Sequence, residues 1–313
     1  EALDKEVGIL LDALEADGVM ENSVIFFWSD HGGNLLRQKR AVGDSGLHVP
    51  LIIRYPDGYR AGETESRMVS LMDLGPTVMS LIGINPPDYM DGKAFAGPFE
   101  EAQRDYIYGS ADRFDESTDM QRSVLDGRYV YIKNFMPELP LIYRNRYREQ
   151  IPMNKYLIEL DAEGKLEGDA AYIFMKTKPL EELYDLKNDP YEVHNLANDP
   201  THAEKLKFLR SQLSQWQASI KDRGFTPESE IIREFWPGMI QPVTADVKIQ
   251  QQNNTIVLSC ATEGASIAYQ LSDAIGTDYW QLYSKPLLLQ PQEKISTRAI
   301  RIGYKASKIT VKN

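Results

Sequence analysis

The residues best suited to chemistry form a short segment, Asp30-His31-Gly32-Gly33, directly after the apolar run 23–29. An aspartate oxygen and an imidazole nitrogen are both common ligands of divalent cations. The two glycines free the backbone for close approach to a ligand. Since ligands bind outside the carboxyl ends of strands in open α/β sheets, the segment predicts a metal site at a sheet edge. The structural alternative, an aspartate that caps a turn beside a packed histidine, stays open on these residues alone.

Two cations, Lys39 and Arg40, follow within ten residues of this pair. Beside a metal they would form a pocket for a tetrahedral oxyanion, in which the metal takes one oxygen and the lysine another. His48, just before the apolar run 49–56, could face the same edge. The alternatives are that the two cations are solvated surface charges and that His48 is a packed histidine.

The elements that must position these residues alternate between helix and strand over the first 111 residues. Leucine and valine at helical spacing predict a helix over 2–16. The runs 23–29 and 49–56 predict strands covered on both faces, as in a parallel sheet, and 104–111 predicts a third buried strand. Residues 70–83 predict a helix with Asp73 as its N-cap and Gly83 at its end. This order predicts an α/β layer architecture over residues 1–120.

The pattern changes after about residue 120. Two strand-like runs flank Asp126-Gly127, which predicts a hairpin, and a leucine-rich helix is expected around 206–216. The stretch 137–180 has no clear period and is expected to be irregular. Residues 121–232 should therefore form a small antiparallel α+β subdomain. Residues 233–244 are expected to be a linker, and residues 245–313 a β-sandwich of short strands.

Composition and charge exclude several classes of partner. The 313 residues carry a net charge of −11, which argues against a nucleic-acid or anionic-membrane partner. The single cysteine, Cys260, leaves no intrachain disulfide and no cysteine-based metal cluster. No apolar run is long enough to suggest a membrane span.

Four segments occur in the order found in the type I sulfatases, which belong to the alkaline-phosphatase-like superfamily. They are SVIFFWSDHGG (23–33), KRAVGDSGLHVPLIIRYPDG (39–58), VSLMDLGPTVMSLIG (69–83) and ELYDLKNDPYEVHNLA (182–197). The chain resembles this family over roughly residues 1–225, and it most resembles bacterial enzymes of the heparan N-sulfatase (sulfamidase) type. The resemblance implies that residues 1–120 are part of a three-layer α/β sandwich.

The resemblance also implies roles for particular residues. Asp30 and His31 match the strand-end pair that binds the catalytic Ca²⁺, although many sulfatases have asparagine in place of His31. Lys39 matches the lysine that contacts the sulfate. The stretch 111–122 lies where substrate-side loops are expected, with a solvated acidic loop as the alternative. The candidate sugar contacts are Arg40, His48, Asp112, Arg113, Asp115 and Arg122.

One part of the family pattern does not occur in this chain. Sulfatases of this type carry a C/S-x-P-x-R motif, oxidised to formylglycine, and an aspartate pair that supplies further metal ligands. Cys260, in SCATEG, has neither the proline nor the arginine. We therefore expect both features in an N-terminal half that precedes residue 1. Without that half, the chain should lack the nucleophile and be unstable alone.

The resemblance implies that the intact enzyme hydrolyses a sulfated sugar, such as an N- or O-sulfoglucosamine-type glycan. The metal and Lys39 would neutralise the sulfate oxygens while the formylglycine hydrate displaces the sugar amine or alcohol. A bacterial enzyme of this kind is expected in the periplasm or outside the cell.

Two alternatives stay open. The first is a metal phosphodiesterase or phosphatase of the same superfamily, for which the later histidines His48, His194 and His202 fit poorly as ligands of a second metal. The second is a non-catalytic, glycan-binding remnant. Residues 264–307 resemble the chitobiase/hexosaminidase C-terminal-like β-sandwich. In that module Tyr279 and Trp280 are either a sugar-stacking platform or part of the core.

Overall fold

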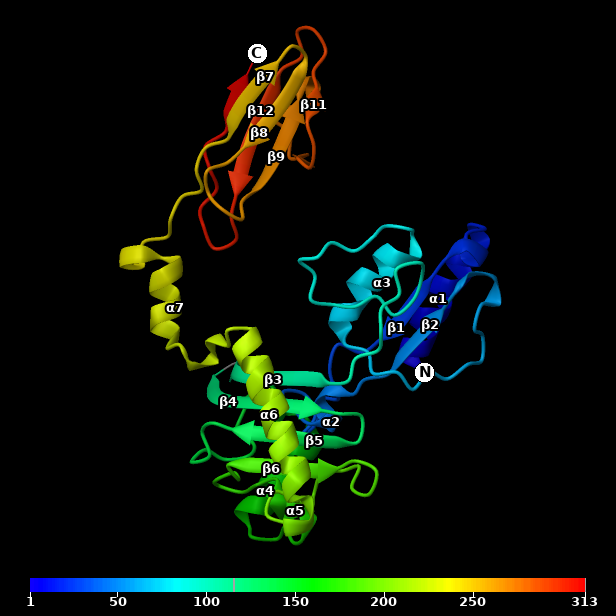
Figure 1. Ribbon diagram of the computed structural model, residues 1–313, viewed down its shortest axis with the longest axis vertical. Helices are drawn as coiled ribbons and strands as arrows, with labels where there is room; N and C mark the ends of the chain where they lie inside the picture. The colour runs from blue at the N-terminus through cyan, green and yellow to red at the C-terminus, as the bar shows by residue number, and fades with distance from the viewer. Residues whose placement is uncertain (115, 313) are drawn as a thin grey trace. The chain divides into compact units, whose positions relative to one another are not determined.

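The computed structural model describes residues 1–114 and 116–312, apart from the side chain of Asp273. The chain divides between Asp222 and Arg223 into two units, which are described in turn (Figure 1). No helix among the described residues combines the length and the apolar character needed to cross a bilayer.

The first unit begins with α1 (Ala2–Ala16) and a two-stranded ribbon of β1 (Ile25–Trp28) and β2 (Leu51–Arg54). The helix and both strands lie where the sequence predicts them. The parallel pairing is wrong, because β1 and β2 run antiparallel, with Phe26 opposite Ile53. No other described strand hydrogen-bonds to this ribbon, so Phe27, Trp28 and Ile52 remain 37%, 45% and 63% exposed instead of being covered.

A capped helix follows the ribbon: a turn over Leu71–Asp73 leads into α3 (Leu74–Leu81). Asp73 is the N-cap residue of α3, as predicted, but its side chain does not cap that helix, and the capping side chain of the preceding turn is Ser70. Ser70 Oγ accepts from the N–H of Met72, and Asp73 accepts from the N–H of Ser70, which forms a capping box. Burial alone would raise the pKa of Asp73, but hydrogen bonds from Arg104 and two backbone N–H groups lower it.

The rest of the first unit is a four-stranded antiparallel sheet in the order β3-β4-β5-β6. Its strands are β3 (Ile107–Phe114), β4 (Ser117–Leu125), β5 (Tyr129–Asn134) and β6 (Glu181–Asp185). The hairpin at Asp126-Gly127 is confirmed. The strand predicted over 104–111 is the start of β3 and belongs to this sheet, so the expected boundary at residue 120 falls inside β4.

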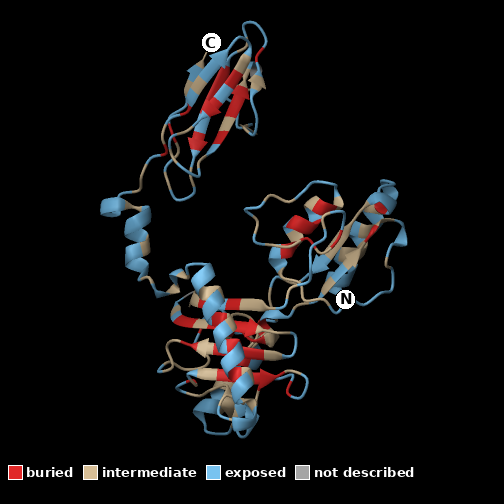
Figure 2. Ribbon diagram, in the orientation of Figure 1, coloured by how far each residue is buried: buried red, intermediate tan, exposed pale blue. Residues whose placement is uncertain are grey.

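Helix α6 (Ala203–Ser219) crosses one face of the sheet, as Figure 1 shows, and confirms the predicted leucine-rich helix. Its buried leucines pack against β4, β5 and β6; the cluster is Val124, Tyr131, Leu183, Leu206, Leu209 and Leu213. Buried residues therefore concentrate on these strands (Figure 2). The stretch 137–180 is more ordered than predicted, because it holds α4 (Pro152–Ala162) and α5 (Asp169–Tyr172). Proline at the first position of α4 is a start signal that the weak apolar period did not reinforce.

The second unit opens with α7 (Glu228–Phe235), which covers the start of the expected linker. Two antiparallel sheets follow, in the orders β11-β8-β7 and β10-β9-β12-β13, as predicted for a β-sandwich. Their strands are β7 (Lys248–Gln252), β8 (Thr255–Ser259), β9 (Ser266–Leu271), β10 (Gln281–Leu282), β11 (Leu287–Leu288), β12 (Ile295–Ile300) and β13 (Thr310–Lys312). Ile256 and Ile295 are fully buried in the core, whereas Tyr279 is 66% exposed.

An ion pair closes the end of β6, and it supports a stability prediction: the Asp185 side chain is 5% exposed and that of Arg128 is 48% exposed. Asp185 accepts two hydrogen bonds from Arg128, at 2.8 and 2.6 Å, and one from Asn188 at 2.8 Å. We expect Asp185→Asn to lower the free energy of unfolding, though by less than the loss of a fully buried pair, because water screens the exposed guanidinium. Urea unfolding at pH 7 measures this change, and Asp161→Asn, at an exposed position of α4, should change it little.

The same pair predicts a pH dependence. The contact with Arg128 lowers the pKa of Asp185 to about 2, below the value of about 3.9 in an unfolded chain. Because the pKa is lowered by folding, the stabilisation is complete above pH 4 and is lost as the pH falls from about 4 to about 2. The stability gap between wild type and Asp185→Asn should close over this window, and a gap that stayed constant would contradict the assignment.

Candidate functional site

The residues predicted to do chemistry lie on one connection between β1 and β2, residues 29–48, which we call the Lys39 loop. Backbone hydrogen bonds fold this loop on itself. Gly32 N donates to Gly46 O at 3.0 Å, and Lys39 N donates to Gly33 O at 2.9 Å. A Cβ atom on Gly32 would lie 2.3 Å from the carbonyl oxygen of Ser45, so only glycine permits this close approach.

Asp30 and His31 turn acceptor atoms toward one another at the start of the loop. His31 Nε2 lies 3.4 Å from Asp30 Oδ2, and His31 Nδ1 lies 2.7 Å from the carbonyl oxygen of Gly32. A carbonyl only accepts, so Nδ1 carries the hydrogen, and Nε2 of a neutral His31 presents its lone pair to the carboxylate. Two facing acceptors of this kind can both bind one cation.

This pair fits part of a divalent-cation site. The Asp30 side chain is 82% exposed and that of His31 35%, so both are accessible to an ion. Ca²⁺ takes six to eight ligands, mostly oxygens, and two residues fill only part of that shell. Within residues 1–114 and 116–312, no group of three or more His, Cys, Asp or Glu side chains is arranged to hold a metal. The remaining ligands would therefore have to come from water, substrate or other groups.

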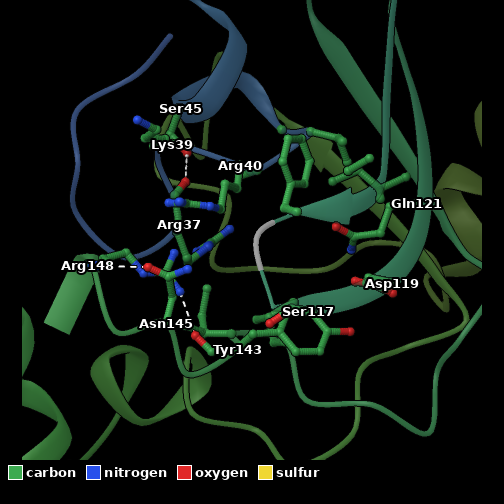
Figure 3. A pocket seen from close by; sticks show the side chains of 18 of the residues that line it. Arg37, Lys39, Arg40, Ser45, Ser117, Asp119, Gln121, Tyr143, Asn145 and Arg148 are labelled. Carbon is green, nitrogen blue, oxygen red and sulfur yellow. Dashed lines mark hydrogen bonds between the residues drawn. The ribbon is translucent and has the colours of Figure 1, made fainter. Parts of the chain in front are cut away.

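Lys39 and His31 line the same hollow, together with Arg40, Ser110 and Phe114. The ammonium of Lys39 lies 5.6 Å from the centre of the Tyr147 ring, a cation–π contact. Lys39 and Arg40 also line a second, adjoining pocket, shown in Figure 3. His31, Lys39 and the second pocket are therefore contiguous.

The second pocket has a polar floor built by β4 and the segment 141–148. Two of its lining residues are held from behind by the buried Lys178, which donates to Asp119 Oδ2 at 2.7 Å and to Tyr143 Oη at 2.9 Å. Burial and the nearby Asp119 carboxylate raise the pKa of Tyr143, so its hydroxyl stays neutral. Gln121 and Asn145 line the same pocket (Figure 3). Neutral or internally paired groups of this kind suit the hydroxyls of a sugar.

Sequence reasoning did not select this polar floor. The sequence pattern that could have predicted it is the alternation of Ser117, Asp119 and Gln121, which places three polar residues on one face of a strand. That signal becomes informative only once 117–125 is recognised as a strand.

The predicted sugar contacts fall in different places. Arg40 lines both pockets, and Asp112 lines the second one. Arg113 lies on β3, outside the residues that line these pockets, and Asp115 lies outside the described residues. His48 is 77% exposed, 3.3 Å from Asp44, and also lies outside the pocket linings.

Arg122 is at odds with its predicted role. Its side chain is 1% exposed, and its guanidinium donates to Asp112 at 2.7 and 3.1 Å and to Asp222 at 2.8 and 2.8 Å. A sugar could reach this guanidinium only by breaking a buried ion-pair network. Arg122 therefore serves the structure of the subdomain, and it holds the Asp112 carboxylate from behind the pocket.

Comparisons with known proteins bear on these predictions. The family described as Sulfatase matches residues 1–84. An ulvan-active sulfatase of Formosa agariphila is 43% identical over 309 residues, which cover 98% of this chain and 52% of that protein. Human N-sulphoglucosamine sulphohydrolase is 26% identical over 256 residues, 77% of this chain and 50% of that protein.

Among solved structures, a 2-O GAG sulfatase matches with a TM-score of 0.52 and 23% identity, over 71% of this chain and 42% of that chain. At this identity the likeness concerns the fold, and it confirms the predicted α/β fold class. The chain spans about half the length of the curated relatives it matches. The four matching segments, the family match and these relatives agree, and the chain belongs to the sulfatase family.

Proposed function

We propose that this chain is part of an enzyme that hydrolyses sulfate from a sulfated sugar. One observation carries the proposal: Lys39 and His31 line one hollow, with the Asp30 carboxylate 3.4 Å from His31. Cationic and metal-ligating groups at one place suit an anion that must be bound and neutralised during transfer. The names of two relatives, an ulvan-active sulfatase and an N-sulphoglucosamine sulphohydrolase, support a sulfated glycan as the substrate class.

Each residue has a defined task in this proposal. Asp30 and His31 would hold Ca²⁺, which supplies Lewis-acid polarisation of a sulfate oxygen when bound. Lys39 donates a hydrogen bond to another sulfate oxygen and fixes the orientation of the group. Hydroxyls of the sugar exchange hydrogen bonds with three polar side chains of the second pocket, those of Asp119, Gln121 and Tyr143. The formylglycine nucleophile and further metal ligands of the family would come from a part of the protein outside this chain.

A polymeric glycan does not cross a membrane unaided, so we place the enzyme in the periplasm or outside the cell. The sulfated sugar and the remainder of the protein are then its expected partners.

The test is release of inorganic sulfate by the complete encoded protein. Ulvan, N-sulfoglucosamine and O-sulfated glucosamines are incubated with the protein, and free sulfate is measured by ion chromatography. We expect sulfate from at least one of these glycans and no phosphate from matched phosphate monoesters and diesters. Phosphate release without sulfate release would support the phosphatase alternative, and glycan binding without either product would support a non-catalytic role.

A further inference from the structure

We infer that Glu192 is a positioning residue, which holds the Lys39 loop against the four-stranded sheet and so sets the place of the Lys39 ammonium. The inference rests on the proposed function, because it concerns the lysine that is proposed to bind sulfate. Glu192 lies in the turn between β6 and α6, more than 140 residues after the loop it contacts.

The contacts between Glu192 and the loop are direct. Its side chain is buried, with 1% of the residue exposed; the carboxylate accepts from Asp44 N at 3.0 Å and lies 3.4 Å from Ser45 Oγ. A Cβ atom on Gly43 would lie 2.5 Å from Glu192 Oε1. The loop backbone therefore rests on the carboxylate with no room for a side chain between them.

The contacts continue from Glu192 to the segment on the other side of Lys39. Arg37 donates to the carbonyl oxygens of Tyr191 at 3.2 Å and Glu192 at 2.8 Å. Ser45 Oγ donates to the carbonyl oxygen of Arg37 at 2.6 Å, as Figure 3 shows. The loop is therefore attached to Glu192 on both sides of Lys39, through Arg37 before it and through Asp44 after it.

The loop needs such attachments because its backbone is strained on either side of Lys39. Arg37 and Arg40 have φ of 63° and 77°, and Glu192 itself has φ of 53°. Left-handed conformations are unfavourable for residues with a Cβ and persist only when the surroundings hold them. Without the carboxylate, we expect this winding to relax and the Lys39 ammonium to move.

Burying a carboxylate costs free energy unless the group is paired and hydrogen-bonded, so a turn with only a structural role would not need one. Burial raises the pKa of Glu192, although the Asp44 N–H and the nearby Arg37 act in the opposite direction. The carboxylate accepts hydrogen bonds from the backbone N–H groups of two loop residues, Asp44 and Ser45, which an apolar side chain of similar size could not do. The buried Glu192 carboxylate therefore lowers the stability of the fold but fixes the position of the Lys39 loop.

The test compares Glu192→Ala with Asp185→Asn in the complete protein. Asp185 is a buried carboxylate of the same 181–197 segment, but it binds Arg128 and not the Lys39 loop. For Glu192→Ala we expect kcat/KM for sulfate release to fall by about tenfold to a hundredfold, the scale of an ångström-size misplacement, and inhibition by inorganic sulfate to weaken in parallel. Glu192→Gln, which keeps an acceptor for Asp44 N, should recover most of this loss. Asp185→Asn should stay near the wild-type value at a temperature where all variants are folded.

A second readout does not depend on activity. Trypsin can cut after Arg37, Lys39 and Arg40, so release of the loop in Glu192→Ala should speed cleavage there relative to wild type and Asp185→Asn. If Glu192→Ala does not fold, Ser45→Ala removes the hydroxyl link to Arg37 and carries the same test. Wild-type protein that released no sulfate would refute the proposed function, while the cleavage pattern would still report on the attachment. Cleavage and kcat/KM of Glu192→Ala equal to those of Asp185→Asn would overturn the inference.

Discussion

Replacing Lys39 by alanine is expected to lower kcat/KM for sulfate release by about 10²–10³-fold, the usual cost of removing one donor to a reacting anion. Lys39 lines both pockets and shares the first with His31, so its loss removes a donor from the proposed sulfate site. The measurement is sulfate release under subsaturating substrate, with the folded state checked by circular dichroism.

Two variants control this experiment. Lys165→Ala removes a lysine that is 65% exposed and paired with Glu163, away from either pocket lining, and should leave kcat/KM unchanged. Lys39→Arg keeps the charge but replaces a compact ammonium by a planar fork, so only partial activity is expected. A Lys39→Ala protein with kcat/KM within about twofold of wild type would exclude Lys39 from the binding of the reacting group.

Replacing Arg122 by methionine is expected to lower the free energy of unfolding by about 3–5 kcal/mol, the cost of removing one partner from a buried ion-pair network. The substitution leaves the Asp112 and Asp222 carboxylates without the guanidinium that both now contact. Urea unfolding followed by tryptophan fluorescence measures the change.

Arg60→Ala is the matched control, because Arg60 binds Glu63 and Glu65 at the surface. Its loss should change the free energy of unfolding far less than Arg122→Met does, because water screens an exposed pair. Adding Asp112→Asn and Asp222→Asn to Arg122→Met should recover part of the loss, since the orphaned charges are then gone. An Arg122→Met effect as small as that of Arg60→Ala would refute the structural role of this network.

Local signals in the sequence located most elements of the fold. The periodic leucines of α1 and α6 and the Asp126-Gly127 hairpin are properties of short segments, and the structure has each of them. The pairing of β1 with β2 is different. A continuous apolar run indicates burial on both faces, but which strands supply that cover is decided by chain segments far away. Among the described residues only β2 pairs with β1, in the antiparallel sense.

The candidate site shows the same division. Asp30, His31 and Lys39 could be selected because their chemistry is concentrated within ten residues. Lys178 and Glu192 could not, since Lys178 contacts the pocket residue Asp119, and Glu192 contacts Asp44, only after the sheet and its turns have formed. Arg122 was misleading because a charged residue in a polar stretch suggests a surface loop, whereas it lies on β4 among buried neighbours.

A crystal structure of the complete protein with calcium and sulfate would show directly whether Asp30, His31 and Lys39 hold the metal and the anion. We expect an ion about 2.3–2.6 Å from a carboxylate oxygen of Asp30, with His31 in contact, and a sulfate oxygen about 2.7–2.9 Å from the Lys39 ammonium. Calcium and sulfate bound together elsewhere, with Asp30, His31 and Lys39 all facing solvent, would contradict it.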